Sequence, residues 1–417
     1  MHLKTILNRL QRHKSFVYGA ARFLDRTAGP ALEVEVQPRA NGRPLCSGCG
    51  RSAPGYDRRP ARRFQFVPLW GLPVYFRYAP RRVDCPRCGI KVEKLPWAEG
   101  KSRLTTAFVW FLAGWAKLLA WQQVATAFRT SWDSVYRAVT FAVAWGLTQR
   151  SLEGIEAIGI DEIQWRKGHK YLTLVYQIQE GCKRLLYVGV DRTEKSLSGF
   201  FDLLGQAGVK ALRFVCSDMW QPYLTVIAAR AGQVIHVLDR FHIMAKLNKA
   251  IDEVRAAEVK RLKRDGYEPV LRHARWCLLK RPENLTREQT VKLAELVKYN
   301  LATVRAYLLR EEFQRFWGYR SAAWAGRFLK EWCTRVLRSR IEPLKKVART
   351  LRAHEGLLLN WFRAQGTMSS GAVEGLNYNA KLTLKKAYGF RTVRGVKVAL
   401  YHRLGNLPEP KFTHRFC

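Results

Sequence analysis

Apolar and polar positions alternate in the middle of the chain as they do in a buried sheet. The stretch 155–163 (IEAIGIDEI) is an apolar run that ends in a carboxylate, Asp161. A buried central strand has this pattern when it delivers one charged group to the edge of a sheet. A second apolar strand (ALRFVCSD) closes on Asp218 in the same way. Further patterns lie between them: strands at 170–179 and 184–192 and a helix over 194–206.

Three strands, a helix and a fourth strand in this order predict an RNase H-like α/β domain. A helix and another apolar strand (VIHVLD) follow and end at Asp239. From 240 to about 363 the pattern is helical and heavily basic, which predicts an all-α insertion. The fold class we expect is therefore multidomain α+β, with that insertion interrupting the α/β domain.

After the insertion, one more amphipathic helix is expected. Ser369 or Ser370 would cap it, and Glu374 lies in its first turn, where the positive end of a helix favours a carboxylate. Asn377 and Lys381 share the face of Glu374, because they follow it by three and seven residues. An ordinary surface salt bridge between Glu374 and a lysine is the alternative interpretation.

Residues 102–149 have a helical pattern. One apolar helix is expected over 105–119, followed by a helix, a short turn and a second helix that begins at Trp132 behind the N-cap Ser131. Ser134 and Arg137 lie on the polar face of this second helix, which a helix-turn-helix would offer to the major groove. Two packed helices with a short turn also occur without DNA, so the spacing alone does not decide.

The charge changes the interpretation of all these elements. Lysine and arginine number 73 against 33 acidic residues, a formal net charge of +40. This excess indicates a polyanionic partner, and nucleic acid before an anionic membrane. No segment has the length and apolar character of a membrane span, and charged residues interrupt the N-terminal stretch where a signal peptide would be apolar. We therefore expect a cytoplasmic protein, nucleoid-associated in a bacterium, with reduced thiols.

Cysteine spacing predicts a structural zinc site. Cys46 and Cys49 form one C-x-x-C knuckle, and Cys85 and Cys88 form a second one 35 residues further on. Four thiolates complete a tetrahedral shell and leave no position for a catalytic water, so one structural Zn²⁺ is expected. The other cysteines lack ligand spacing and are expected to be inert thiols: Cys182, Cys216, Cys277, Cys333 and Cys417.

Basic and aromatic residues alternate between the two knuckles. A zinc-pinned β-hairpin that presents Arg62 and Arg63 to phosphates fits this stretch, and a ribbon with merely solvated charges is the alternative.

Together these motifs resemble the DDE transposases of bacterial insertion sequences, in particular the ISL3 family. The resemblance covers nearly the whole chain and rests on the two knuckles and on GIDE, KGHKYLT, CSDMWQPY, VLDRFHIMAKLNKAIDEVR and VEGLNYNAKLTLKKAYGFR. It implies an RNase H-like catalytic domain, a DDE triad of Asp161, Asp218 and Glu374, and contact of Lys381 with the DNA end.

Three carboxylates suit phosphodiester chemistry. Two Mg²⁺ (or Mn²⁺) ions held by oxygen ligands can activate the nucleophile on one side and stabilise the leaving oxygen on the other. The expected reaction is hydrolysis at the transposon end, followed by attack of the freed 3′-hydroxyl on target DNA. A homodimer or larger assembly on double-stranded DNA is expected, because two element ends must be held.

The roles of several residues near the expected triad are open to more than one interpretation. Glu162 should point to the face of the strand opposite Asp161. Asp239 either supports the site or caps the next helix. His242 and His169 either position phosphate or a nucleotide or are ordinary packed or surface histidines.

The expected division is an N-terminal region with the zinc module (1–100), a helix-turn-helix domain (101–150), the first catalytic part (151–239), the insertion (240–365) and the final helices (366–417). Two other classes of protein remain open, namely a DNA-binding regulator with a decayed catalytic fold and a nuclease that cuts without joining.

Overall fold

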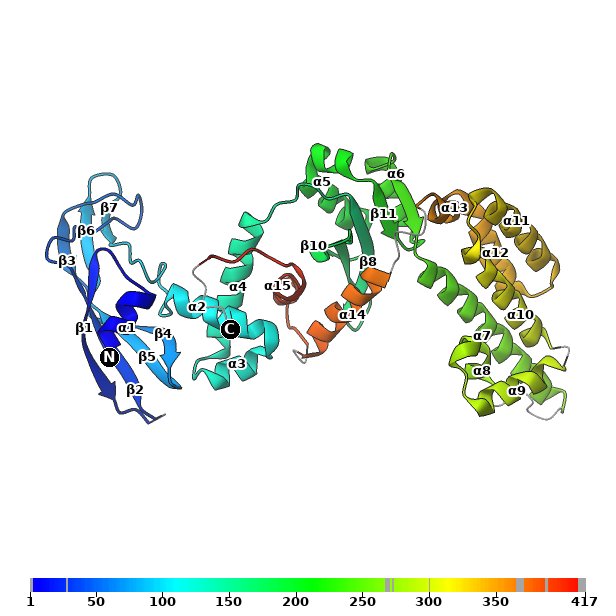
Figure 1. The fold of residues 1–417 in the computed structure, drawn as a ribbon, viewed down its shortest axis with the longest axis horizontal. Helices are drawn as coiled ribbons and strands as arrows, with labels where there is room; N and C mark the ends of the chain where they lie inside the picture. The colour runs from blue at the N-terminus through cyan, green and yellow to red at the C-terminus, as the bar shows by residue number, and fades with distance from the viewer. Residues whose placement is uncertain are drawn as a thin grey trace. The chain divides into compact units, whose positions relative to one another are not determined.

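The computed structural model describes residues 3–27, 29–266, 271, 274–299, 301–364, 371–386 and 389–411. It confirms a multidomain protein of mixed α and β structure (Figure 1). The chain forms two compact units. The first unit comprises Met1–Ser151 and Thr383–Cys417, and the second comprises Leu152–Leu382.

Two small sheets build the N-terminal part of the first unit. The four-stranded sheet has the order β1-β2-β5-β4 and the three-stranded sheet the order β3-β6-β7. Trp97 is fully buried against the four-stranded sheet and packs edge-on against Phe16 and Tyr78. The elements are α1 (Leu3–Leu10), β1 (Phe16–Leu24), β2 (Ala31–Pro38), β3 (Gly55–Arg58), β4 (Arg62–Leu69), β5 (Leu72–Tyr78), β6 (Arg81–Cys85) and β7 (Gly89–Val92).

The hairpin that carries Arg62 and Arg63 does not belong to the same sheet as the cysteines, contrary to the expected zinc-pinned hairpin. Its strands, β4 and β5, belong to the four-stranded sheet, whereas Cys85 ends β6 in the three-stranded sheet. The alternation of 62–78 correctly predicts strands, but strand alternation carries no information about which sheet a strand joins.

Helices complete the first unit: α2 (Thr106–Leu118), α3 (Trp121–Ala127), α4 (Trp132–Gln149) and α15 (Val393–Leu404). The apolar helix expected over 105–119 is α2, with Thr105 as its N-cap. Ser131 caps α4 as expected, because its hydroxyl accepts a hydrogen bond from the amide of Ser134 at 3.1 Å. We call α3 and α4 the helix pair.

A five-stranded sheet of order β10-β9-β8-β11-β12 organises the second unit. Strands β8, β9 and β10 are antiparallel, and β11 runs parallel to both β8 and β12. One face packs on α5 and α6 through Ile158, Ile160 and Phe200. The elements are β8 (Ala157–Arg166), β9 (Lys170–Gln177), β10 (Arg184–Val190), α5 (Glu194–Ala211), β11 (Phe214–Ser217), α6 (Gln221–Arg230) and β12 (Ile235–Leu238).

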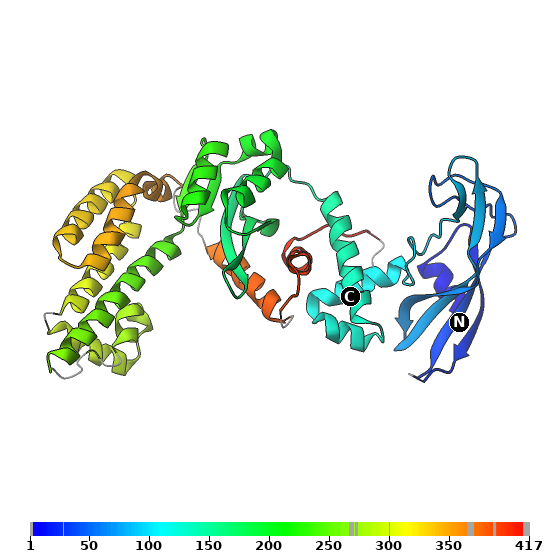
Figure 2. The same ribbon diagram turned by 180° about the vertical axis from the view of Figure 1, so that it is seen from behind.

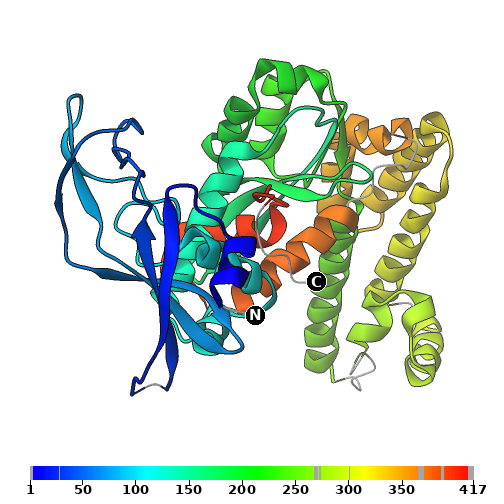
Figure 3. The same cartoon turned by 60° about the vertical axis from the view of Figure 1, so that its left-hand side comes forward.

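Helix α14 (Gly371–Lys386) covers the other face of this sheet. The backbone of Gly159 on β8 leaves no room for a β carbon, because Val373 of α14 fills that space. Figures 1 and 3 show α14 beside β8. The predicted caps Ser369 and Ser370 lie outside the described residues.

Between β12 and α14 the described residues contain helices and no strand, as the basic helical pattern predicts (Figure 2). Buried Glu258 of α7 accepts hydrogen bonds from the amides of Ala302 and Thr303, so it caps α10. The helices are α7 (Arg240–Arg264), α8 (Arg275–Leu279), α9 (Arg287–Val297), α10 (Ala302–Gln314), α11 (Ala322–Arg338), α12 (Glu342–Ala353) and α13 (Glu355–Arg363). Nowhere in the described residues does a helix have the length and apolar character that a membrane crossing requires.

Candidate functional site

Asp161 lies near the middle of β8, with 15% of its side chain exposed. Its Oδ1 accepts a hydrogen bond from the amide of Glu162 at 2.7 Å. Its Oδ2 accepts one from Nδ2 of Asn377, which projects from α14. The hydroxyl of Tyr176 on β9 donates to Oδ1 of Asn377 at 2.7 Å. Because the amide oxygen is engaged by Tyr176, its NH₂ group faces Asp161.

Two more carboxylates reach the same edge of the sheet. Asp218 directly follows β11, and Asp239 directly follows β12. Since β8, β11 and β12 run parallel, their carboxyl ends meet at one edge. Asp218 accepts a hydrogen bond from the amide of Trp220 at 3.0 Å, and Asp239 caps α7 by accepting from the amide of Phe241 at 2.7 Å. The N-cap interpretation of Asp239 is thus correct.

His242, in the first turn of α7, lies between the carboxylates of Asp161 and Asp239. Its Nε2 lies 3.7 Å from Oδ2 of Asp239 and 4.0 Å from Oδ1 of Asp161. We call Asp161, Asp218, Asp239 and His242 the strand-end cluster.

The carboxyl groups of the strand-end cluster are largely buried. Burial, assisted by the neighbouring carboxylates Asp218 and Asp239, raises the pKa of Asp161 to about 6, although the hydrogen bond from the amide of Glu162 and the proximity of His242 lower it. Burial also raises the pKa of Asp218. A buried group of acids with raised pKa values gains most from a bound cation, and oxygen ligands suit a hard one.

Glu374 and Lys381 lie on exposed positions of α14, on the side of the helix that carries Asn377. Glu374 precedes Asn377 by about one turn, and within the described residues its carboxylate makes no hydrogen bond or ion pair. The structure therefore brings Asp161, Asp218, Asp239 and His242 together and places Glu374 on the helix that is hydrogen-bonded to Asp161.

Glu162 points away from the strand-end cluster, to the face covered by α5 and α6. Its carboxylate pairs with Arg192 at 3.4 Å. The guanidinium of Arg192 lies 4.3 Å from the ring centroid of Tyr171 and 4.6 Å from that of Trp220. Burial raises the pKa of Glu162 to about 7.

His169 is not brought to the cluster. It occupies the turn between β8 and β9 with a positive φ of 58°, past the end of the strand that carries Asp161. Five strand positions from Asp161 to Arg166 already span about 16 Å.

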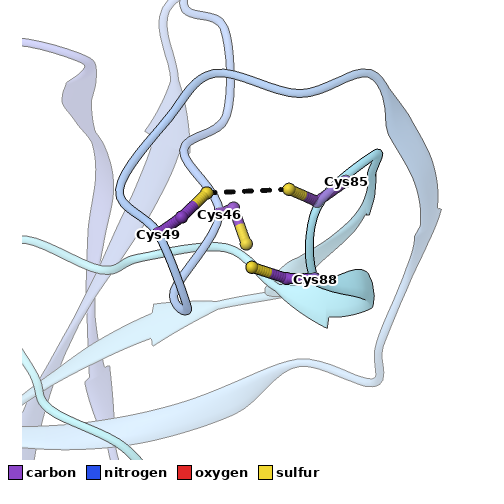
Figure 4. Close-up of side chains that lie close together, drawn as sticks. All are labelled: Cys46, Cys49, Cys85 and Cys88. Carbon is purple, nitrogen blue, oxygen red and sulfur yellow. Dashed lines mark hydrogen bonds between the residues drawn. The ribbon is translucent and has the colours of Figure 1, made fainter.

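The four predicted zinc ligands form a second site (Figure 4). The Sγ atoms of Cys46, Cys49, Cys85 and Cys88 all lie within 4.8 Å of one another, and among the described residues they form the group that is close enough to share one ion. Cys49 and Cys85 are 3.6 Å apart, near the roughly 3.8 Å expected for two sulfurs on a tetrahedral ion with Zn–S bonds of about 2.3 Å.

Backbone geometry supports this group of cysteines. A β carbon at Gly48 would lie 3.1 Å from the sulfur of Cys88, so the knuckle needs glycine there. Gly50 and Gly89 have positive φ values of 73° and 66°, as the tight turns require. The backbone N–H groups of Arg87 and Cys88 lower the pKa of the Cys85 thiol to about 7, which favours the thiolate that binds metal.

The residues of the hairpin and of the helix pair that are predicted to contact DNA have partners within the chain. Arg137 pairs with Asp133 at 2.8 Å on the exposed face of α4. Arg63 pairs with the buried Glu33, and Arg62 donates to the carbonyl of Lys101 at 3.1 Å. Ser134 contributes its amide to the cap of α4.

Sequence reasoning missed three features of the candidate sites. It placed Asn377 on the face of Glu374 but gave it no role, although that shared face was the available signal. It gave no role to Tyr176, because a buried tyrosine in an apolar strand looks like core. It also missed the aromatic group at the start of α4, where Trp132 stacks on Tyr136 and contacts Trp121.

Comparison with known proteins identifies the family to which the chain belongs. A family model described as a transposase, of the ISL3 type of DDE enzyme, matches residues 158–399, which is more than half of the chain. The transposase for insertion sequence element IS1001 of Bordetella parapertussis is 28% identical over 367 residues, covering 87% of this chain and 89% of the relative. The transposase for insertion sequence element IS1557 of Mycobacterium tuberculosis (strain CDC 1551 / Oshkosh) is 28% identical over 417 residues, covering 94% and 92%. The chain therefore belongs to the ISL3 family of DDE transposases and is a DNA transposase of the insertion-sequence type.

Proposed function

We propose that this transposase binds the terminal inverted repeats of an insertion sequence, cleaves a DNA strand at each end in a Mg²⁺-dependent reaction and transfers the freed end into target DNA. Asp161, Asp218 and Glu374 are the proposed catalytic residues and ligands of two Mg²⁺ (or Mn²⁺) ions. The proposal is supported above all by the buried strand-end cluster, to whose Asp161 the Glu374-bearing helix is hydrogen-bonded through Asn377.

The second unit supports an RNase H-like assignment. Three antiparallel strands are followed by a helix and by a fourth strand that lies parallel to the first. Strand β11 pairs with the first half of β8, from Phe214 opposite Ala157 to Cys216 opposite Gly159, and continuing this register puts Asp218 opposite Asp161. In the proposed division the helices α7–α13 are an insertion into this catalytic domain, between its last strand and the helix with Glu374.

When bound, the divalent ions would activate the attacking oxygen and stabilise the leaving one. The residues of the chain have separate tasks. Asp161 and Asp218 supply carboxylate oxygens in a desolvated position, where the charge of a cation is felt strongly. Glu374 would complete the ligand set from α14, and Lys381, two turns further on the same side, would contact a phosphate of the DNA end. His242 and Asp239 would support the arrangement.

The helix pair is the proposed helix-turn-helix reader of the DNA ends. Ser134 and Arg137 lie in the first turns of α4, the part of a recognition helix that contacts base edges. Arg137 can exchange its exposed partner Asp133 for a phosphate or base, because an exposed ion pair contributes little. Arg62 and Arg63 are proposed backbone contacts. The four cysteines would hold one structural Zn²⁺, and a homodimer or larger assembly would bring two ends together.

The test uses labelled duplexes that carry the inverted repeats flanking the gene, a target plasmid, and either Mg²⁺ or EDTA. Wild type, Glu374→Gln and the control Glu355→Gln, on an insertion helix, are run side by side. Cleaved and joined products that require both metal and Glu374 support the proposal. Specific binding of the ends without any product would instead indicate a regulator, and cleavage without joining would indicate a nuclease.

A further inference from the structure

The two most exposed large hydrophobic side chains of the described residues lie at one end of the same sheet. Trp70 is 82% exposed and Phe23 is 69% exposed. Phe23 stands next to the end of β1, and Trp70 lies in the turn from β4 to β5. Because β1 is antiparallel to β2 and β2 is parallel to β5, the end of β1 and the β4–β5 turn are at the same end of the sheet.

The backbone holds Trp70 in an unusual conformation for a bulky residue. Trp70 has a φ of 50° and Gly71 a φ of 77°, and the flanking residues Leu69 and Leu72 are paired. A two-residue hairpin turn with two positive φ values favours Asn-Gly or Asp-Gly, and a tryptophan in the first position is uncommon.

No side chain in the described part of the chain engages this indole. Among the described residues Trp70 makes no hydrogen bond and no ring contact, whereas Trp97, Trp110, Trp121 and Trp132 all pack against other rings. An exposed aromatic side chain in a disfavoured backbone conformation indicates a contact with something outside the chain.

The side chains near Trp70 indicate which kind of molecule it contacts. The β1–β2 turn shares this end of the sheet, and a β carbon at its Gly29 would lie 3.1 Å from Nη1 of Arg129 in the turn between α3 and α4. The guanidinium of Arg26 in the same β1–β2 turn lies 5.1 Å from the ring centroid of Tyr75. Two arginines and two exposed aromatic side chains therefore lie near this end of the sheet, close to the turn of the helix pair, in a chain of net charge +40. This composition fits nucleic acid.

We propose that Trp70 stacks on an unstacked base of the transposon-end DNA held by the helix pair, with the β4–β5 hairpin acting as a rigid wedge. The proposal rests on the proposed function, because it needs the chain to bind those ends. An aromatic wedge between base steps kinks a duplex and opens it locally, and the aromatic face tolerates any base.

The experiment measures permanganate reactivity of thymines placed at successive positions of the terminal repeat, with full-length protein and Mg²⁺ replaced by Ca²⁺. Three variants are compared with wild type: Trp70→Asn, Trp70→Phe and the control Trp324→Ala, which removes a 60% exposed tryptophan on α11. Trp70→Asn creates the favoured Asn-Gly turn, so its melting temperature should equal or exceed that of wild type.

Wild type and Trp324→Ala should make one thymine at least tenfold more reactive, Trp70→Phe should retain part of this, and Trp70→Asn should lose it while still binding the repeat. Persistence of the reactive thymine in Trp70→Asn would overturn the proposal. So would binding of the repeat by wild type with no reactive thymine, an outcome that leaves the proposed function standing. Failure of wild type to bind the repeat at all would overturn both. Conversion of a dimer to a monomer by Trp70→Asn, with reactivity unchanged, would assign the indole to a protein partner instead.

Discussion

The amide of Asn377 on α14 donates a hydrogen bond to Oδ2 of Asp161 on β8, across 216 positions of sequence. Tyr176 fixes the direction of this bond, because its hydroxyl occupies the oxygen of the same amide. The bond orients the Asp161 carboxylate and, at the same time, seats the helix that carries Glu374. One side chain thus links two of the three proposed catalytic carboxylates.

This link predicts a specific effect of removing one oxygen atom. In Tyr176→Phe the amide of Asn377 loses the hydrogen bond that orients it, so strand-transfer activity should fall about tenfold and the free energy of unfolding by about 1–2 kcal/mol. Asn377→Leu should cost more activity, about 100-fold, because it leaves Oδ2 of Asp161 without its donor. Tyr378→Phe, on the exposed side of the same helix, is the matched control. Equal activity of Tyr176→Phe and Tyr378→Phe would contradict the positioning role.

Close packing of α14 on β8 gives a second prediction. Gly159 accepts Val373 so closely that no β carbon fits between them. Gly159→Val should therefore push α14 away from the sheet, destabilise the second unit by about 1–3 kcal/mol and abolish cleavage. Circular dichroism melts and end-cleavage assays measure both effects. Gly154→Val is the comparison, because a β carbon at this turn glycine would meet no other atom. Its positive φ of 68° is unfavourable for valine, so the variant should be less stable. The packing of α14 on β8 should nevertheless be unchanged.

Sequence patterns predicted the elements that carry the candidate site better than they predicted its contacts. The three apolar strands form as expected, because a buried parallel strand is apolar along its length and a charged residue in or beside it is conspicuous. Strands β11 and β12 end just before Asp218 and Asp239, whereas β8 continues past Asp161 to Arg166. The helical pattern after Asp239 likewise gives α7 from Arg240.

The failures have physical reasons. The hairpin with Arg62 and Arg63 joins a different sheet from the cysteines, since period-2 alternation specifies a face and not a neighbour. The hydrogen bond from Asn377 to Asp161 depends on the rotation of α14 about its axis relative to β8. The close packing of Val373 against Gly159 fixes that rotation, and no sequence pattern shows this packing. The break in α5 at Gly205, with a φ of 71°, occurs next to the expected helix end at 206, because a glycine in that conformation cannot continue a helix.

Raised acid pKa values predict a stability that depends on pH. An acid with a pKa above its unfolded value binds more protons in the folded state, so its stabilising contribution is complete below pH 4 and is lost as the pH rises. For Asp161 the loss extends from about pH 4 to about pH 6 and amounts to about 2–3 kcal/mol; for Glu162 it continues to about pH 7. With EDTA present, the melting temperature should therefore fall between about pH 4 and pH 7, and these two acids should cause no further fall at higher pH.

Two comparisons check this assignment. Asp161→Asn should flatten the decline, because the amide has no proton to lose. Mg²⁺ or Mn²⁺ should restore stability at pH 8 in the wild type, since a cation binds the ionised form. A decline that is the same in Asp161→Asn would show that other groups cause it.

Removal of one cysteine ligand should unfold the three-stranded sheet and leave the proposed catalytic carboxylates in place. Hydrophobic contacts of the three-stranded sheet are few, namely Ala53 and Val83 beside the cysteines, so its stability should depend on the metal. Cys49→Ser should lose bound zinc, measured by elemental analysis, and lower the affinity for the terminal repeat. Cys182→Ser, in the turn between β9 and β10 and outside the cysteine group, should retain zinc and affinity. The pH-dependent stability of Asp161 should be the same in both variants, because that carboxylate belongs to the other unit. If Cys49→Ser kept its zinc and its affinity for the repeat, the four cysteines would not hold a structural ion.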